Sequence, residues 1–497
     1  MREKIDCFLP CNDVAEIADS LQTLSQSKTT QHINLLVSDA SDICACGDSD
    51  SISDCTVITI DGLTSTKTLL TIEEHTDAEY VLLSLKHTPV SLGLHALDRL
   101  LRVATDSNVG MVYADCYIQK DGVQEKHPTI DYQTGSIRDD FDFGQLVLIR
   151  ASLLHEYAAK QHLADYKWAG FYDLRLYISR KSQIFHLNEY LYTQVETDSR
   201  KSGERQFDYV NPRNREVQIE MEQAATKHLD KIGATVDTSK YMKPDYSEQD
   251  FTYEASVIIP VFNRAKTIAD AVGSALAQKT TFKYNVIVVD NHSTDGTSDI
   301  LEAAAAEDKR LIHIIPERTD LGIGGCWNMG VHHPKCGKFA VQLDSDDVYK
   351  DENTLAIMVR AFYEQNCAMV VGTYMMTDFN MNMIAPGIID HKEWTPANGR
   401  NNALRINGLG APRAFYTPVL REVKVPNTSY GEDYALGLNF SRQYQIGRVY
   451  DVVYLCRRWD DNSDASLDIV KMNGHNLYKD RIRTWELQAR IAMNKNK

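Results

Sequence analysis

The feature that most constrains this chain is an internal repeat. Residues 256–263 (SVIIPVFN) resemble residues 6–13 (DCFLPCND). Further along, residues 339–347 (FAVQLDSDD) take the place that residues 80–88 (YVLLSLKHT) hold in the first half. A repeat that is found before any fold is assigned decides where a chain divides. This repeat predicts two similar domains in tandem.

The two copies differ in their acidic residues. The second copy has Asp344 and Asp346 where the first has Leu85 and His87. Chemistry that needs carboxylates is therefore expected in the second copy.

The length of 497 residues fits two long domains, and the balance of 43% apolar and 25% charged residues is that of a soluble globular protein. We expect a degenerate domain at 1–200, a helix and linker at 201–253, a catalytic domain at 254–465 and a C-terminal helix at 466–497. The oligomeric state does not follow from the sequence, because an apolar face between two domains resembles one between two chains.

The formal net charge of −16 argues against nucleic acid as a partner, since phosphate neutralisation needs clustered Lys and Arg. The sequence contains no run of about 18 uncharged apolar residues, so no membrane-spanning helix is expected. The N-terminal residues lack the apolar core of a signal peptide, which favours a cytoplasmic protein. Peripheral association with the inner face of a membrane, through a local basic patch, stays open.

The ten cysteines are scattered, which favours reduced thiols over a disulfide framework. Cys44, Cys46 and Cys55 could hold a metal, but they supply only three ligands. A surface loop of small residues is the alternative.

Strands and helices alternate along the second copy. Buried-type strands are expected at 256–260, 285–289, 311–315 and 339–343, and helices at 265–278, 298–306 and 351–360, with Asp295 or Thr297 as the N-cap of the second helix. This alternation predicts an α/β fold, a mainly parallel Rossmann-like sheet with helices on both faces. Ligands of such sheets sit beyond the carboxyl ends of the strands, where Asp290 and Asp344 would converge.

The first copy repeats the plan. Strands are expected at 33–37, which leads into Asp39, and at 80–83. Each copy closes with a polar helix, at 213–231 and at 475–493. Residues 233–250 lack periodicity and are typical of a linker.

The central chemical motif is Asp344-Ser345-Asp346-Asp347. Two carboxylates at this spacing repel each other unless a cation lies between them. Hard oxygen ligands favour Mg²⁺ or Mn²⁺, which commonly bind one or two carboxylates and the phosphates of a substrate. The alternative is an acidic turn that caps the following helix.

This motif has companions in a fixed order. They are Pro260 and Asn263, then Asp290, then Gly322 and Asn328, and finally Glu432-Asp433. Over about 254–465, this order resembles the family 2 glycosyltransferases, which have the GT-A fold.

The resemblance implies a role for each motif. Asp290 would bind the nucleotide of a sugar donor, together with Pro260, Asn263, Gly322, Asn328 and Asp344. Asp344 and Asp346 would hold Mn²⁺ or Mg²⁺ on the donor diphosphate. Asp433, with Glu432 second, would be the general base. The implied donor is a nucleotide-diphosphate sugar, a UDP-sugar rather than a GDP-sugar, and the implied acceptor is a saccharide or lipid-linked saccharide.

These roles agree with the chemistry of sugar transfer. A metal on the diphosphate offsets the charge that develops on the leaving group. A carboxylate accepts the proton of the incoming hydroxyl, and its position opposite the diphosphate implies inversion. Taken alone, Glu432 and Asp433 could simply be acids at the N-terminus of a helix.

Several positions depart from the family pattern. Asn291 stands where a second acid is common, and Asp320 stands where Asn is common. Trp459 replaces a frequent metal-binding His, and Asp460 or Asp461 could compensate.

Other residues allow two interpretations. Trp327 could stack on a base or sugar, or lie in the core. Trp394 could belong to an acceptor loop, and Gly408, Gly410 and Arg413 could shape the acceptor pocket. His292 is expected in an exposed turn.

The first copy has Gly170-Phe171 in place of Glu432-Asp433, and Thr197 in place of Trp459. It keeps Asp39 at the nucleotide position, so weak binding of a nucleotide or glycan stays open. It would be a structural partner, an acceptor-binding module or a metal-independent transferase. For the whole chain, the alternatives to a transferase are a non-catalytic glycan- or nucleotide-binding scaffold and a nucleotidyltransferase. The second lacks support because Phe262–Lys266 contains no glycine-rich phosphate loop.

Overall fold

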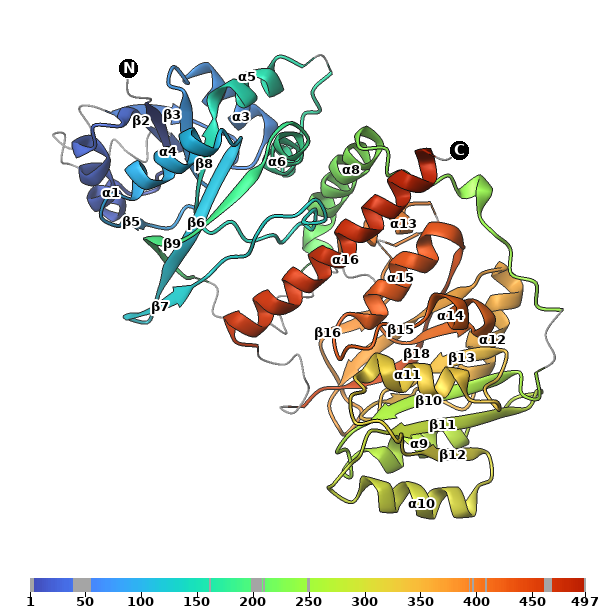
Figure 1. Cartoon of the computed structure of the whole chain (residues 1–497). Coiled ribbons are helices and arrows are strands. Elements are labelled where there is room, and N and C mark those ends of the chain that lie inside the picture. Colours follow the sequence, from blue (N-terminus) through green and yellow to red (C-terminus); the bar gives the residue numbers. More distant parts are fainter. Residues whose placement is uncertain are drawn as a thin grey trace. The chain divides into compact units, whose positions relative to one another are not determined.

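The chain forms two compact units, each built on one sheet of nine strands (Figure 1). The computed structural model describes residues 4–38, 55–160, 162–197, 208, 211–247, 251–392, 394–395, 397–406, 409–459 and 467–495. Unit 1 comprises residues 1–201, 213–234 and 467–487, and unit 2 comprises residues 202–212, 235–466 and 488–497. Asp39, Cys44, Cys46, Gly408, Asp460 and Asp461 lie outside the described residues.

Unit 1 alternates strands and helices over its first half. Its strands are β1 (Ile5–Pro10), β2 (Thr30–Val37), β3 (Cys55–Thr59), β4 (Tyr80–Ser84), β5 (Val90–Leu92), β6 (Met111–Lys120), β7 (Val123–His127), β8 (Leu146–Arg150) and β9 (Ile184–Val195). Its helices are α1 (Val14–Gln26), α3 (Thr66–Glu74), α4 (Ala96–Ser107), α5 (Ala151–Ala158), α6 (Gly170–Lys181) and α8 (Arg215–Lys231), after the 3₁₀ turn Pro212–Asn214.

Unit 2 has the same kind of alternation. Its strands are β10 (Ala255–Val261), β11 (Tyr284–Asp290), β12 (Leu311–Ile314), β13 (Phe339–Gln342), β14 (Val348–Tyr349), β15 (Met369–Thr377), β16 (Met383–Ile389), β17 (Arg413–Tyr416) and β18 (Ile446–Arg457). Its helices are α9 (Ile268–Leu276), α10 (Thr297–Glu307), α11 (Ile323–His332), α12 (Thr354–Gln365), α13 (Gly399–Asn402), α14 (Thr417–Val423) and α15 (Glu432–Gln443). The last helix of the chain, α16 (Ile469–Lys495), is divided between the two units.

The two sheets have the same order of strands. Unit 1 runs β3-β2-β1-β4-β8-β6-β9-β5 with β7 on β6, and unit 2 runs β12-β11-β10-β13-β17-β15-β18-β14 with β16 on β15. Every strand of one sheet therefore has a counterpart in the other, as a duplicated domain predicts. The duplication itself stays a prediction.

The α/β fold class is confirmed, with a refinement of the sheet. Strands β12, β11, β10 and β13 are parallel neighbours, but β17 pairs antiparallel with both β13 and β15. Each sheet is therefore mixed rather than mainly parallel. The parallel strands are apolar along their length, and all seven residues of β11 are buried, as expected of strands that are covered on both faces.

The bounds of several elements differ from those expected. Helix α9 begins at Ile268 instead of 265, because Asn263 has a positive φ of 51° and the chain turns before the helix. Gly296, with a φ of 96°, is the N-cap of α10, while Asp295 accepts the backbone N–H of Thr297. Helix α16 begins at Ile469 rather than 475.

The segment expected as a linker packs against unit 2. Tyr246 donates to the carbonyl of Cys367 at 2.6 Å, and its ring makes an edge contact with Phe339. This part of the chain therefore belongs to the same compact unit as Asp344, and the expected domain bounds stay a prediction. Among the described residues, no helix combines the length and the apolar character needed to span a bilayer.

A buried ion cluster holds the first part of α16 within unit 1. Asp480 is fully buried and accepts from Ser136 at 2.9 Å and from Arg483 at 2.9 Å, while Arg138 lies 3.3 Å away. Removing this carboxylate would take away an acid that two buried guanidinium groups share, although Arg138 would keep Asp140 at 2.7 Å.

We therefore expect Asp480→Ala to lower the free energy of unfolding by about 3 kcal/mol in urea titrations. Asp106→Ala is the matched control, because Asp106 pairs with Arg102 on an exposed helix surface and such pairs contribute below about 0.5 kcal/mol. Equal effects of the two substitutions would contradict the role of Asp480.

Candidate active site

Three elements of unit 2 bring charged side chains together at one edge of its sheet. Asp344 lies two residues after the end of β13, Arg413 is the first residue of β17, and Asp433 lies in the first turn of α15. Because β13 and β17 are antiparallel, with Val341 opposite Ala414, the end of one strand lies beside the start of the other. The sheet therefore fixes the spacing of these groups.

Arg413 is the centre of this cluster. Its side chain is 10% exposed, and Nη1 donates to Oδ2 of Asp433 at 2.6 Å and to the carbonyl of Leu409 at 2.8 Å. Burial lowers the pKa of this guanidinium, but the charges of Asp433, Asp344 and Glu432 outweigh it and the pKa is raised. Arg413 thus stays charged and shares its charge among three acids.

Gln342 joins Asp344 to the same cluster. Its Nε2 donates to Oδ1 of Asp344 at 2.8 Å, and its Oε1 accepts the backbone N–H of Arg413 at 3.2 Å. The backbone N–H of Asp344 donates to the hydroxyl of Tyr454 at 3.1 Å. Gln342, which also binds β17, therefore holds the carboxylate of Asp344, while Tyr454 of β18 holds its backbone.

The acids of the cluster repel one another. Burial raises the pKa of Asp344, Asp346 and Asp433 raise it further, and Arg413 and Gln342 oppose the shift. Burial and the charges of Asp346 and Asp344 raise the pKa of Asp347 well above its usual range. The site thus has more negative charge than its own cations offset.

Glu432 and Asp433 differ in their surroundings, although they are neighbours. Burial, and next the charge of Asp433, raises the pKa of Glu432 to about 8. Oε2 of Glu432 is buried without a hydrogen-bond partner among the described residues. Asp433 has a 34% exposed side chain and the ion pair with Arg413. Asp433 is therefore the more accessible carboxylate of the two.

Asp346 lies on the side of the cluster that faces the end of β18. Its Oδ2 accepts from Nε1 of Trp459 at 3.4 Å and is 3.8 Å from Nε of Arg264. Its backbone carbonyl accepts from Nε of Arg457 at 2.6 Å. Trp459, which stands where the family often has a His, thus contacts the expected metal ligand.

The donor set fits a divalent cation that also binds phosphate. Asp344 and Asp346 could supply two carboxylate ligands, and Mg²⁺ commonly takes one or two from protein. Within the described residues, no group of three or more His, Cys, Asp or Glu side chains is arranged to hold a metal. The raised pKa of Asp344 is the excess of negative charge that a cation would relieve.

The expected nucleotide ligand Asp290 is at the end of β11, but its side chain is 0% exposed. It accepts from the backbone N–H of Ser293 at 3.0 Å and from the hydroxyl of Ser298 at 2.5 Å, and His313 lies 3.4 Å away. Burial raises the pKa of Asp290, but these bonds outweigh it and hold the pKa below its usual range. In this structure Asp290 shapes the turn after β11.

Asn291 and Asn263 lie beside Asp290. Nδ2 of Asn291 donates to the carbonyl of Leu321 at 2.8 Å, while its Oδ1 is buried and has no partner among the described residues. Oδ1 of Asn263 accepts the backbone N–H of Thr294 at 2.8 Å, which joins the turns after β10 and β11. Pro260 lies within β10 and is partly buried.

Gly322 and Asn328 hold the segment that leads to α15. The N–H of Gly322 donates to Oδ1 of Asn427 at 2.8 Å. The amide of Asn328 makes two bonds with the backbone of Val425, at 2.7 Å and 3.0 Å. Both polar atoms of the Asn328 side chain thus have partners in the protein. Its direct contact with a donor stays a prediction.

The aromatic alternatives resolve in part. Trp327 is 7% exposed and makes an edge contact with Phe415, so it is a core residue. His292 has a φ of 64° and lies in a turn, where its ring contacts the carbonyl of Arg318. The expected place of Trp394 in an acceptor-binding loop stays a prediction.

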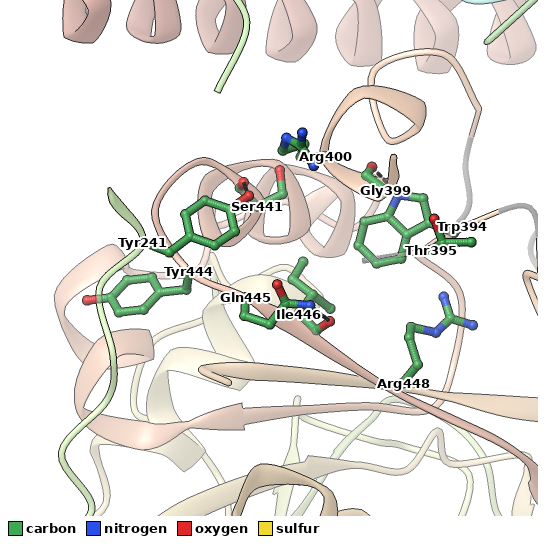
Figure 2. A pocket seen from close by; sticks show the side chains of 10 residues that line it. All are labelled: Tyr241, Trp394, Thr395, Gly399, Arg400, Ser441, Tyr444, Gln445, Ile446 and Arg448. Atoms are coloured by element: carbon green, nitrogen blue, oxygen red, sulfur yellow. Dashed lines mark hydrogen bonds between the residues drawn. The ribbon is translucent and has the colours of Figure 1, made fainter. Parts of the chain in front are cut away.

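Trp394 lines a small pocket of unit 2 with Tyr241, Ser441 and Arg448 (Figure 2). The indole lies beside Gly399, whose carbonyl accepts its Nε1–H, and it is 3% exposed. Ser441 is near the end of α15 and Asp433 near its start, so the pocket is about 12 Å along the helix from the carboxylate cluster. This pocket is not the candidate active site.

The counterparts of these residues in unit 1 are apolar or lack a side chain. The strand registers place Leu83, Leu85 and Val147 where unit 2 has Gln342, Asp344 and Arg413. All three belong to or pack on one apolar cluster of unit 1, as does Phe171. A Cβ on Gly170 would lie 2.4 Å from the backbone nitrogen of Thr66. No acid pair can stand there without a shift of the backbone.

Two contacts of the site were not anticipated from the sequence. Arg413 was expected to shape an acceptor pocket, and its ion pair with Asp433 was missed, as was the part played by Gln342. The only signal in the sequence is that both residues flank short apolar runs of the kind that form buried strands.

Residues 256–414 match the family model described as Glycosyl transferase family 2. The glycosyltransferase GlyG of Streptococcus pneumoniae is 30% identical over 123 residues, which are 25% of this chain and 40% of that protein. The chain thus spans about two fifths of the length of this relative. The Escherichia coli protein UDP-Glc:alpha-D-GlcNAc-diphosphoundecaprenol beta-1,3-glucosyltransferase WfgD is 25% identical over 246 residues, 49% of this chain and 88% of that protein.

Among solved structures, TarS 1-349 of S. aureus in complex with UDP-GlcNAc aligns with a TM-score of 0.37 and 21% identity, over 48% of this chain and 72% of that one. The mannosyltransferase PcManGT of Pyrobaculum calidifontis, in complex with GDP-Man and Mn²⁺, aligns with a TM-score of 0.34 and 18% identity, over 59% and 87%. On the family match, this chain contains a glycosyltransferase family 2 domain in its second unit.

Proposed function

We propose that unit 2 transfers a sugar, with inversion, from a nucleotide-diphosphate donor to a saccharide or lipid-linked saccharide on the cytoplasmic side of a membrane. The observation that carries this proposal is that Asp344 and Asp433 converge on Arg413, with Asp346 beside them, in a domain of this family. Such a set can serve both a leaving group and an incoming hydroxyl.

Asp344 and Asp346 would hold Mn²⁺ or Mg²⁺. When bound, the cation supplies positive charge against the diphosphate as the bond to the sugar breaks. Arg264 lies on the same side, 3.8 Å from Asp346. It adds a second positive charge beside the expected diphosphate.

Asp433 would be the general base. It is partly exposed, and Arg413 holds Oδ2 in one orientation at 2.6 Å. Glu432 has a pKa raised to about 8 by burial and by the charge of Asp433, so it carries its proton at neutral pH. Asp433, partly exposed and held by Arg413, is then the member of the pair that can accept the proton of the acceptor hydroxyl.

A UDP-sugar is the favoured donor and a lipid-linked saccharide the favoured acceptor. The name of the E. coli relative specifies UDP-Glc and a diphosphoundecaprenol-linked sugar. The buried Oδ1 of Asn291, which has no partner among the described residues, offers an acceptor for an N–H of the base or a hydroxyl of the ribose.

Unit 1 would be non-catalytic. Its counterparts of Gln342, Asp344, Arg413 and Asp433 are Leu83, Leu85, Val147 and Phe171, which pack together as an apolar cluster. None of these four side chains has a carboxylate that could bind a metal or act as a general base. A structural role, or the binding of an acceptor elsewhere on this unit, is consistent with that loss.

The first test measures release of nucleoside diphosphate from UDP-, GDP- and dTDP-sugars, with Mn²⁺ or with EDTA. We expect one donor to turn over, and both EDTA and Asp346→Ala to lower the rate at least about 100-fold, because charge on the diphosphate is no longer offset. His87→Ala, at the corresponding position of unit 1, is the control and should leave the rate unchanged.

Activity that survives both EDTA and Asp346→Ala would contradict the metal site in unit 2. Absence of turnover together with absence of donor binding in calorimetry would favour the scaffold alternative.

The second test separates the two acids of α15. Asp433→Asn should lower kcat by about 10²–10⁴-fold, the usual contribution of a general base, while donor affinity changes little. Asp451→Asn, a matched change at an exposed position of β18, should have no effect. A large loss in Glu432→Gln with little loss in Asp433→Asn would reverse the assignment.

The third test uses the pH dependence of stability. Between about pH 4.5 and 8, folded Glu432 keeps a proton that the unfolded chain has lost, so the free energy of unfolding falls as pH rises. Glu432→Gln should therefore lose less stability than the wild type between pH 5 and 8 in urea titrations. Glu302→Gln, on the exposed side of α10, is the control. Identical slopes for wild type and Glu432→Gln would contradict the raised pKa.

A further inference from the structure

The hairpin of strands β15 and β16 presents large apolar side chains to solvent. Phe379, Met381, Met383 and Ile388 are 40%, 38%, 61% and 50% exposed. These four residues are called the apolar hairpin below. They lie within ten residues of one another in unit 2, on a turn and on a strand whose only partner among the described strands is β15 (Figure 1).

The turn of this hairpin is held by its own hydrogen bonds. Oδ1 of Asp378 accepts the backbone N–H groups of Asn380 and Asn382, at 2.8 Å and 2.9 Å, and Oδ2 accepts from the amide of Asn382 at 3.0 Å. The side chains of Phe379 and Met381 are thus carried outward on a defined turn. Their exposure is a feature of the fold.

The equivalent hairpin of unit 1 shows that apolar residues are not required at this place. Strand β7 holds the position on β6 that β16 holds on β15. Its exposed residues are Val123, Gln124, Glu125 and Lys126. A polar sequence therefore builds the same hairpin, and the exposed Met and Ile side chains of β16 need another explanation.

The apolar hairpin is continuous with the candidate active site. The ring of Phe379 makes an edge contact with Trp459 at 5.5 Å, and Nε1 of Trp459 donates to Asp346 at 3.4 Å. Positive side chains lie along this contact. The exposed Lys266 is 6.0 Å from the ring of Trp459, and the partly exposed guanidinium of Arg264 is 5.8 Å from it. Arg457, 4.8 Å from the ring of Phe379, is buried and paired with Asp270.

We propose that the apolar hairpin docks unit 2 on the surface of an anionic lipid bilayer. Apolar side chains inserted among the acyl chains, with Lys and Arg beside the phosphates, are the combination that binds such a surface. The inference rests on the proposed function, because a lipid-linked acceptor would then reach Asp433 from the membrane side.

A bilayer fits these residues better than a second copy of the chain does. A stable protein interface takes about 800 Å² from each partner, which four side chains on one hairpin do not supply. A bilayer needs no complementary pocket, and a few inserted side chains suffice for reversible binding when cations lie beside them. Lys266 and the partly exposed Arg264 provide that charge although the whole chain is acidic.

The test is flotation of the full chain with vesicles of phosphatidylcholine that contain about a third phosphatidylglycerol, and with vesicles of phosphatidylcholine alone. We expect binding to the anionic vesicles, and a loss of at least about fivefold in the double variant Met383→Ser/Ile388→Ser. Val123→Ser is the matched control, since Val123 is 57% exposed on the hairpin of unit 1. Melting curves show whether the variants stay folded.

Two outcomes would overturn the docking proposal. One is a wild-type chain that does not float with anionic vesicles, and the other is a double variant that floats as well as the wild type. If light scattering shows a wild-type dimer that the double variant dissolves, while vesicles are not bound, the occupant is a second copy.

Release of nucleoside diphosphate in water, without vesicles, keeps this proposal apart from the proposed function. The double variant should retain that activity, because Met383 and Ile388 do not contact the carboxylate cluster. Turnover without vesicle binding contradicts only the docking surface. Vesicle binding that depends on the hairpin, without turnover of any donor, contradicts only the transferase.

Discussion

The candidate site depends on one buried guanidinium. Arg413 is nearly enclosed, and a charge in that position is tolerable only with close partners, which are Oδ2 of Asp433 and the carbonyl of Leu409. Its backbone N–H is tied through Gln342 to the carboxylate of Asp344. The separation between the expected metal ligand and the expected base is therefore set by two antiparallel strands, which are stiffer than the loops that flank them.

Three of the residues expected to bind the donor make hydrogen bonds to loop residues of the protein in this structure. Asn328 holds Val425, Asp290 holds Ser293 and Ser298, and Asn263 holds Thr294. Each of these polar side chains satisfies backbone groups of a loop that borders the sheet edge, where unpaired groups would be costly. These residues thus hold the loops beside the sheet edge at which Asp344, Asp346 and Asp433 lie.

The sequence predicts the parallel part of the sheet well, because residues 256–260, 285–289 and 339–343 are apolar runs of strand length. It does not predict that the four residues of β17 enter between β13 and β15, since so short a run has no periodicity. The pairing of Arg413 with Asp433 was missed for this reason. The burial of Asp290 was missed because an acid after a strand looks the same whether it faces solvent or serine hydroxyls.

The comparison of the two units shows why such a site is kept or lost as a set. If Asp433 alone became Phe, Arg413 would lose the acid that it contacts at 2.6 Å while its own charge stayed buried. If Arg413 alone became Val, the buried acids around it would lose the cation that opposes their mutual repulsion. Unit 1 has Leu83, Leu85, Val147 and Phe171 at the corresponding places, and these pack as one apolar cluster with no orphaned charge. Replacing a whole buried charged set by apolar residues of similar volume preserves stability, whereas replacing one member does not. The intact charged set of unit 2 is therefore maintained by its own electrostatics as well as by any function that it serves.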